Sequence, residues 1–492
     1  MRYDVGRFRR PMRRSTEGQL MSLISLGDGS TLTLDFTTGV LDPRLTFTRA
    51  SGGTYTGNDG LVYGMDFATS GSLAIGIGPR SVTLTATAGV DRRYLVGQTV
   101  YISNGANNMS GPVTAYNAST QVLTIDATAT NGSGSFTSWT VGNASARFDY
   151  DPTTGSPRGL LIEGSATNLC LNGSMAYTAT APTSWVRGFS GCTVASVDST
   201  TFPGQKAWSI SATASGQRDL LEQVISLAAN TTYTVSVYLE AVTGTTATFA
   251  YMTSLPAGAT SGTVVNPSAG RISFTVTVGA TAGNGTLRLG IGTASGTGVS
   301  ADASVRFSHV QVEAGSGASS YILTGASQGT RNPDYCVMDG ISSFFTSQSS
   351  LTMLIDATPR FQSGFPALWR LTDAGNANSY ELYYTSSGTN NTYATKVAVG
   401  GVSSGESNFA NSIAQDTRQI MGYAIASGVG FRSRNGASAS AQIPTSLPSA
   451  ALTRLGIGSS GLSANPATAH IRRIKYWPYA MTQDQLNGVT TP

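Results

Sequence analysis

Short segments in which apolar and polar residues alternate recur along the whole chain. Leu32–Phe36 and Thr232–Leu239 both place an apolar side chain at every second position. A period of two puts these side chains on one face of a strand, so each segment predicts a half-buried β-strand. The one clear helical signal is Thr482 with Gln485, a capping-box pair that predicts a short helix stopped by Gly488. The pattern therefore predicts an all-β protein.

Turn residues divide the predicted strands into groups. Five short strand-like runs in residues 72–141 predict a small β-barrel or sandwich. This unit interrupts two segments, 31–71 and 142–167, which together predict one split β module that closes around the insertion. About eight strand-like runs in residues 168–328 predict a jelly-roll sandwich, and a last group of strands fills residues 329–492. We therefore expect several β domains.

Composition supports folded domains and places the positive charge at one end. Charged residues make up 11% and hydrophobic residues 40% of the 492 residues, whereas disordered chains show the opposite balance. The first 14 residues contain one acid and six arginines: Arg2, Arg7, Arg9, Arg10, Arg13 and Arg14. The rest holds 24 of the 30 basic and 25 of the 26 acidic residues. We expect residues 1–30 to form an extended basic arm.

Arginine suits an arm that docks on another protein, because its planar fork pairs bidentately with carboxylates. A solvated tail is the alternative interpretation. The arm lacks the interleaved aromatic residues typical of segments that bind nucleic acid, so we do not expect a nucleic-acid partner.

Cysteine spacing and hydropathy exclude further classes. Cys170, Cys192 and Cys336 cannot form a closed set of disulfides and fit no zinc motif, which suits assembly in a reducing cytoplasm. No apolar run approaches the roughly 20 residues that span a bilayer. Leu20–Leu26 is too short and too rich in serine for the core of a signal peptide. We expect no membrane insertion and no export signal.

Four motifs on either side of the predicted insertion carry a resemblance. They read PRLTFTRAS from Pro43, ARFDYDP from Ala146, GLLIE from Gly159 and ATNL from Ala166. In this order they resemble a segment common in minor structural and tail-appendage proteins of tailed bacteriophages. The resemblance implies a virion protein, assembled in the host cytoplasm, that attaches to other virion proteins through its N-terminal arm. It also implies a homotrimer.

Two further resemblances concern the larger domains. The stretch from Asn168 to Glu313 resembles carbohydrate-binding jelly rolls, and His470–Leu486 resembles the closing strand and helix of concanavalin A-like lectin sandwiches. Together they imply attachment to surface glycans of the host. Aromatic faces stack on sugar rings while amides and carboxylates bind hydroxyl groups, so the candidate sugar-binding residues are Trp369, Asp373, Asn376, Tyr380 and Trp185. The alternative is that most of these rings fill the core.

No catalytic constellation, cofactor motif or metal-ligand spacing stands out. The two histidines, His309 and His470, lie in predicted strands and fit no nucleophile triad. A glycosidase needs two carboxyl groups across one bond, whereas the acids that were considered are scattered: Glu222, Glu240, Asp356, Asp373 and Glu381. We expect no enzyme. A purely architectural collar or decoration protein remains the main alternative, and a polysaccharide depolymerase is a further one.

Overall fold

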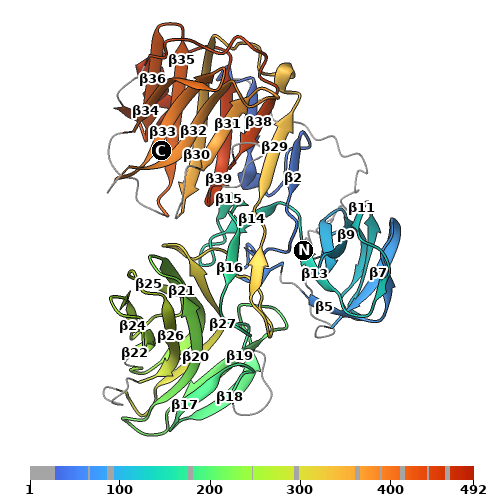
Figure 1. The fold of residues 1–492 in the computed structure, drawn as a ribbon, viewed down its shortest axis with the longest axis vertical. Coiled ribbons are helices and arrows are strands. Elements are labelled where there is room, and N and C mark those ends of the chain that lie inside the picture. The colour runs from blue at the N-terminus through green and yellow to red at the C-terminus, as the bar shows by residue number, and fades with distance from the viewer. Residues whose placement is uncertain are drawn as a thin grey trace, which may run out of the picture.

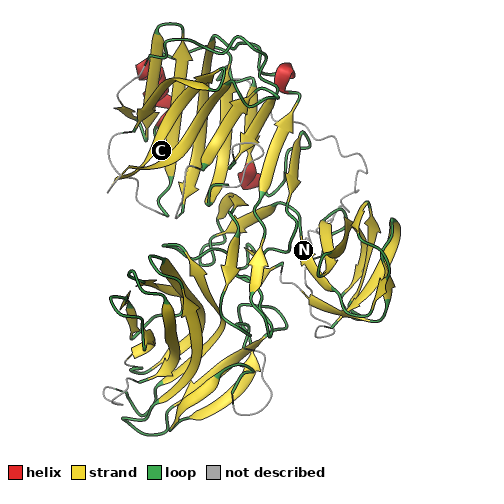
Figure 2. Ribbon diagram, in the orientation of Figure 1, coloured by secondary structure: helices red, strands yellow, loops and turns green. Residues whose placement is uncertain are grey.

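A computed structural model describes residues 28–64, 67–85, 94–175, 181–246, 248–292, 299–360, 366–387, 390–409, 416–439, 443–459 and 466–492. Their regular structure is almost entirely β-strand (Figures 1 and 2), so the predicted all-β class is confirmed. Residues 1–27, with all six arginines of the predicted arm, lie outside the described residues. None of the described helices is long and apolar enough to cross a membrane.

The largest body is a sandwich of two antiparallel sheets, at the top of Figure 1. The eight-stranded sheet contains β14 (Arg147–Tyr150), β15 (Pro157–Ile162), β39 (Ala469–Trp477), β30 (Ser350–Pro359), β35 (Gln419–Ala426), β36 (Val429–Arg434) and β37 (Ala437–Ala439), with β1 (Leu32–Asp35) also on β39. The seven-stranded sheet runs β2 (Leu45–Thr48), β29 (Tyr335–Asp339), β38 (Arg454–Ile457), β31 (Ala367–Thr372), β32 (Ser379–Ser387), β33 (Asn390–Val399) and β34 (Val402–Asn408).

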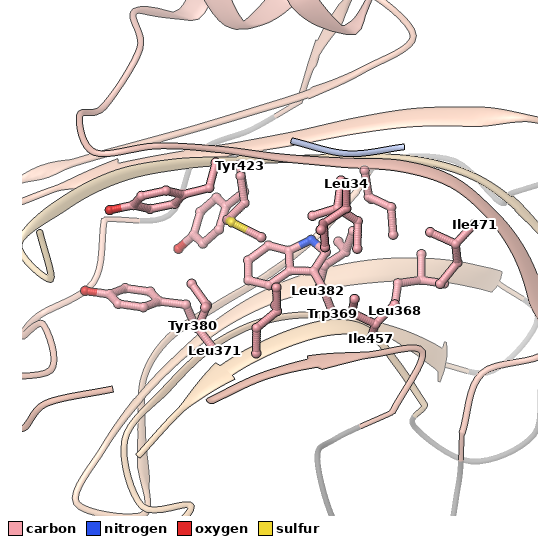
Figure 3. Close-up of a cluster of buried hydrophobic side chains, with 14 of the residues drawn as sticks. Leu34, Leu368, Trp369, Leu371, Tyr380, Leu382, Tyr423, Ile457 and Ile471 are labelled. Atoms are coloured by element: carbon pink, nitrogen blue, oxygen red, sulfur yellow. The ribbon is translucent and has the colours of Figure 1, made fainter. Parts of the chain in front are cut away.

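The predicted split module is not a separate domain, because all its longer strands belong to this sandwich. Strands β1 and β15 lie end to end along one edge of β39, with Leu34 opposite Ile474 and Leu161 opposite His470. Strand β2 pairs with β29 in the other sheet. The alternating pattern of β1 gives it one apolar face, and that face is buried only when a second sheet covers it. Leu34 accordingly points into the core beside Trp369 (Figure 3).

The C-terminal helix α1 (Gln483–Thr490) covers part of the eight-stranded sheet through its buried Leu486. The predicted capping box is present, since Thr482 and Gln485 each accept the other's backbone N–H. Gly488 does not stop the helix, which continues to Thr490, whose hydroxyl donates to the Leu486 carbonyl. Short 3-10 turns occupy Phe36–Thr38 and Ile341–Ser343.

The first inserted body is a small closed barrel, at the right of Figure 1. Its strands are β5 (Phe67–Ser70), β7 (Gly78–Leu84), β8 (Thr99–Asn104), β9 (Asn107–Asn117), β10 (Val122–Ala127) and β13 (Thr140–Asn143). Because β10 pairs with both β7 and β9, the sheet has no open edge at that point. Strand β11 (Ala129–Asn131) adds to β9, and β6 (Leu73–Ala74) pairs with β12 (Ser135–Phe136).

The second inserted body is the jelly roll, at the bottom of Figure 1. One sheet runs β17 (Val186–Ser190), β20 (Asp219–Leu227), β26 (Gly283–Ile291), β22 (Thr248–Thr253) and β24 (Thr263–Val265). The other runs β18 (Thr193–Asp198), β19 (Lys206–Ser211), β27 (Ser304–Ala314), β21 (Thr232–Thr243), β25 (Gly270–Thr277) and β23 (Thr260–Ser261). Trp208, Phe249 and Phe307 are buried between them.

A two-stranded ribbon carries the chain into and out of the jelly roll. Strand β16 (Ala166–Asn168) leaves the sandwich after β15, and β28 (Gly329–Arg331) returns beside it to β29. A second ribbon, β3 (Tyr55–Thr56) with β4 (Val62–Tyr63), precedes the barrel. One sandwich, built from both ends of the described chain, thus holds the barrel and the jelly roll as two insertions.

Candidate functional site

The motif residues meet in a buried cluster of charges where the insertions leave the sandwich. Arg147 of β14 contacts Glu163 at 2.7 Å and Asp334 at 2.5 Å, and Arg49, just after β2, contacts Asp334 at 2.7 Å. Arg331 of β28 lies 3.3 Å from Glu163. The side chains of these five residues are 0–2% exposed. We call this cluster the ionic junction.

Hydrogen bonds from all three bodies complete the ionic junction. Arg49 donates to the backbone carbonyl of Asn143, at the end of the barrel. Ser320, at the exit of the jelly roll, donates its backbone N–H and its hydroxyl to Glu163. Arg331 donates to the carbonyl of Gly164 in the sandwich. The junction therefore joins the connections of the three bodies through paired charges, and a buried ionic cluster requires such pairing.

Electrostatics keep the junction ionised. Burial alone would raise the pKa of Glu163, but Arg331 and Arg147 hold this pKa well below its usual range. Burial opposes the charge of Arg147, yet Asp334 and Glu163 raise its pKa above the ordinary value. Burial is the largest effect on Arg49 and lowers its pKa to about 10. All three side chains remain charged at neutral pH, so the ion pairs of the junction have a structural role and hold the connections of the three bodies together.

Beside the junction lies an open cleft between the sandwich and the jelly roll, with a volume of about 960 Å³. The eight-stranded sheet supplies one wall, including His470 and Arg472 of β39. The six-stranded sheet supplies the other, including Tyr238 of β21 and Arg271 of β25. The half-buried Tyr55 of the β3–β4 ribbon contributes to the lining. This size lies at the upper end of the range for small-ligand pockets.

Among the described residues, five arginines line the cleft, and four of them have a carboxylate partner. Arg158 contacts Asp151 at 2.9 Å, and Arg360 contacts Asp416 at 3.2 Å. Asp356 accepts two hydrogen bonds from Arg418, at 2.8 and 2.7 Å, and lies 3.9 Å from Arg472. The fifth, Arg271, donates to Ser236 at 3.0 Å and lies 5.0 Å from the ring centre of Tyr238.

Two aspartates of the cleft, Asp149 and Asp151, have lowered pKa values. Burial alone would raise the pKa of Asp149, but hydrogen bonds, first from His470 at 2.8 Å, lower it. The backbone N–H of Thr154 and then Arg158 lower the pKa of Asp151 to about 2. A glycosidase needs a carboxylic acid that is protonated near neutral pH. Neither of these two aspartates meets that requirement.

The aromatic residues predicted to stack on sugars lie in the cores, which corrects that part of the sequence prediction. Trp369 is 1% exposed and Tyr380 is 0% exposed, both inside the sandwich (Figure 3). Trp185 is 5% exposed and packs in the core of the jelly roll. The indole and phenol rings of these residues fill the space between two sheets, which leaves no ring face for a ligand.

Asp373 and Asn376, predicted to bind sugar hydroxyl groups, build the turn between β31 and β32. Asp373 accepts the N–H of Ala377 at 2.9 Å and the side-chain amide of Asn378 at 2.6 Å. Asn376 has a left-handed backbone, with a φ of 58°, and its carbonyl accepts from Arg370. These contacts explain both residue types by turn chemistry, because Asp and Asn stabilise such turns.

The other acids considered for catalysis lie apart in the structure. Glu222 pairs with Arg288 at 2.9 Å on the jelly roll, and Glu381 lies 3.6 Å from Arg370 on the sandwich. Glu240 accepts hydrogen bonds from the hydroxyl groups of Ser199 and Ser308. In the described part of the chain, no three His, Cys, Asp or Glu side chains gather closely enough to hold a metal ion.

Sequence analysis missed the cleft because its residues come from distant segments. Arg271 and Tyr238 are direct neighbours on β25 and β21 although 33 positions separate them. Arg360 reaches the jelly-roll exit by donating to the Ala318 carbonyl at 2.7 Å. The available signal in the sequence was the ARFDYDP motif, whose residues Asp149, Asp151 and Pro152 line the cleft.

Comparison with known proteins gives weak structural likenesses. No protein-family model and no curated protein matches the chain. The CBM40 module of the Ruminococcus gnavus IT-sialidase bound to α2,3-sialyllactose is 14% identical, with a TM-score of 0.26, over 30% of this chain and 84% of the module.

Two other solved structures give similar values. Domain 4 of AbnA, a GH43 extracellular arabinanase from Geobacillus stearothermophilus in complex with arabinotriose, is 11% identical, with a TM-score of 0.27, over 36% of this chain and 82% of that domain. The native heptameric SAP-like pentraxin from Limulus polyphemus is 14% identical, with a TM-score of 0.23, over 29% and 70%. At these TM-scores the likenesses assign neither a family nor a ligand to this chain.

Proposed function

We propose that the protein is a structural, non-catalytic component of a bacteriophage virion, of the tail fibre or spike type, that attaches to a host-surface glycan through the cleft. The observation that carries the binding role is the cleft itself, a polar cavity of about 960 Å³ between two sandwiches. Saccharides need hydroxyl, amide and charged partners, and the cleft supplies serines, threonines, acids and arginines. The motif resemblance supports the virion role.

The remaining parts of this proposal concern assembly. The six arginines between Arg2 and Arg14 attach the chain to other virion proteins, and three copies form the appendage. Light scattering after gel filtration measures the number of copies, and a monomer contradicts the trimer. The second candidate is a purely architectural role, which is favoured by the burial of Trp185, Trp369 and Tyr380.

A cleft-filling variant separates these two candidates. Ser273 is exposed on β25 and lines the cleft, so Ser273→Trp places an indole in the cavity without touching the core. Thr275 is exposed on the same strand but does not line the cleft, which makes Thr275→Trp the matched control. Both variants and the wild type are tested on immobilised bacterial surface polysaccharides, and the release of reducing sugar is followed in the same samples.

We expect saturable binding by the wild type and Thr275→Trp, at least about tenfold weaker binding by Ser273→Trp, and no release of sugar. Release of oligosaccharides would contradict the non-catalytic role and support the depolymerase alternative. If the wild type binds none of the polysaccharides, the glycan-binding role fails and the architectural role stands. Equal binding by all three proteins places the glycan site outside the cleft.

A further inference from the structure

We infer that the cleft selects an anionic saccharide with isolated, singly charged groups, and that Arg271 receives one of these charges. This inference rests on the proposed glycan-binding role and adds the chemical class of the ligand. It predicts that neutral sugars bind weakly or not at all, a distinction that the proposed function by itself does not make.

Arg271 is the cleft arginine whose charge the protein leaves uncompensated. Its Nη2 donates to the hydroxyl of Ser236 at 3.0 Å, and its Nε is buried without a hydrogen-bond partner. Its guanidinium lies 5.0 Å from the ring centre of Tyr238, the residue opposite it in the register of β21 and β25. Within the described ranges no carboxylate is in ion-pair contact with this side chain.

Glu240, the acid on the neighbouring strand β21, already has hydrogen-bond and ion-pair partners of its own. Glu240, two residues after Tyr238, accepts the hydroxyl of Ser308 at 2.7 Å and the backbone N–H of Thr200 at 2.8 Å. It also lies 3.5 Å from Arg306. Glu240 is therefore committed to Arg306 and to hydrogen-bond donors, while the half-buried Arg271 lines the cleft without a carboxylate partner among the described residues. A planar guanidinium accommodates a carboxylate or a phosphodiester through two parallel hydrogen bonds.

The other charges of the cleft limit the ligand to low charge density. Asp149, Asp151 and Glu240 line the cavity together with Arg271, so a ligand with closely spaced negative charges meets carboxylates as well as the arginine. Like charges at close range destabilise a complex, which disfavours nucleic acid and other dense polyanions. A saccharide with one charge per few sugars fits, because exposed groups such as Ser273 and Thr153 can bind its hydroxyl groups.

The residues directly before Arg271, Ala269 and Gly270, also line the cleft. The preceding Gly270 has a φ of 134°, and a Cβ at this position would meet no atom within 4 Å. Gly270 therefore adds no side chain to the lining beside Arg271.

Matched glycans test the inference on the full chain. The probes are bacterial oligosaccharides that contain uronic acid, the same oligosaccharides after reduction of the carboxyl group to an alcohol, and a glycosyl phosphodiester of the teichoic type. We expect the anionic probes to bind at least about tenfold more tightly than the reduced ones, because a hydrogen bond to a charged group is stronger than one to a neutral group. The carboxylate and phosphodiester probes show which anion the cleft takes.

Substitution of Arg271 links the preference to this residue. We expect Arg271→Gln to weaken binding of the anionic probe about 10- to 100-fold and thereby to remove most of the difference between the anionic and the reduced probe. Arg271→Lys keeps the charge without the fork and should fall between the two. Arg218 lies 3.7 Å over the ring of Phe189 on the same jelly roll, outside the cleft lining, so Arg218→Gln is the matched control.

The outcomes separate this inference from the proposed function. Equal binding of anionic and reduced probes by the wild type overturns the anionic selectivity and leaves glycan binding intact. An anionic preference that survives Arg271→Gln overturns the role of this residue. Absence of binding to every probe overturns the inference together with the proposed function.

Discussion

The ionic junction and the cleft are built from the same residue types but differ in how their charges are compensated. In the junction, Arg147 and Asp334 have side chains that are 0% exposed and contact each other directly. In the cleft, Arg271 faces a solvent-accessible cavity and has no carboxylate partner among the described residues. The two regions are adjacent, since Thr54 and Ser320 contribute to both.

This difference in ion pairing distinguishes the structural arginines of the junction from Arg271, which is available to a ligand. A buried charge must be paired, because an unpaired ion in a medium of low dielectric constant is strongly destabilising. A charge at an open cleft keeps part of its hydration and can remain unpaired at little cost. Whether an arginine is paired with a carboxylate, rather than its residue type, therefore distinguishes the ionic junction from the binding surface.

The largest expected effect comes from breaking the junction. Glu163→Gln removes the counter-charge of Arg331 and one of the two counter-charges of Arg147 at the same side-chain size, and we expect it to lower the free energy of unfolding by about 3–5 kcal/mol. Urea denaturation at neutral pH measures the loss. The matched control is Arg44→Gln, which breaks the exposed pair of Arg44 and Asp42 and should cost less than about 1 kcal/mol. Similar losses of unfolding free energy in both variants would show that the ion pairs of the junction stabilise the fold no more than an exposed pair does.

The fold class followed from local pattern, whereas the organisation of the domains did not. Alternation in Leu32–Asp35 identifies a strand with one buried face, and the structure confirms that strand. The partner of this strand is β39, more than 430 residues away, and nothing in its own pattern names that partner. Pairing between distant strands depends on the complete fold. For that reason the split module was predicted as a separate domain, and the jelly roll was not recognised as an insertion.

The candidate site was hidden for a related reason. Tyrosine and tryptophan serve both sugar stacking and core packing, and Trp369 and Tyr380 turned out to fill the core. The motif residues Arg49, Arg147 and Glu163 were visible in the sequence, but their role depends on Asp334, which follows the jelly roll. Exposure and pairing are tertiary properties, so the sequence could propose residue types for binding but could not choose among copies of the same type.

The pH dependence of folding stability should show an effect of intermediate size, which comes from a single buried histidine. His309 is fully buried, stacks on Phe202 at 3.4 Å between ring centres and makes no ion pair with another described residue. Burial lowers its pKa well below the usual value. The unfolded chain therefore binds a proton that the folded chain rejects, and stability is lost as the pH falls below about 6.5. This single group should remove about 2 kcal/mol between pH 8 and pH 5.

His309→Asn provides the test, because asparagine tolerates the left-handed backbone at this position, where φ is 52°. We expect the variant to be less stable than the wild type at pH 8, through lost packing, but to lose less stability between pH 8 and pH 5. The nearby Tyr238 and Tyr321 have pKa values raised by burial and do not titrate in this range. Glu163 also stays charged there, since its pKa lies well below the usual value. Parallel pH profiles for the two proteins would show that His309 is not the source.

The smallest expected effect on stability is the most informative about the cleft. Arg271→Gln removes one hydrogen bond to Ser236 and a contact with the ring of Tyr238, so we expect a change below about 1 kcal/mol in urea denaturation. If this substitution weakens ligand binding about 10- to 100-fold but barely changes the free energy of unfolding, Arg271 serves ligand binding rather than folding. A loss of unfolding free energy as large as that of Glu163→Gln would instead assign Arg271 a structural role like that of the ionic junction. In that case the cleft would be an extension of the junction, and the architectural role would gain support from the same measurement.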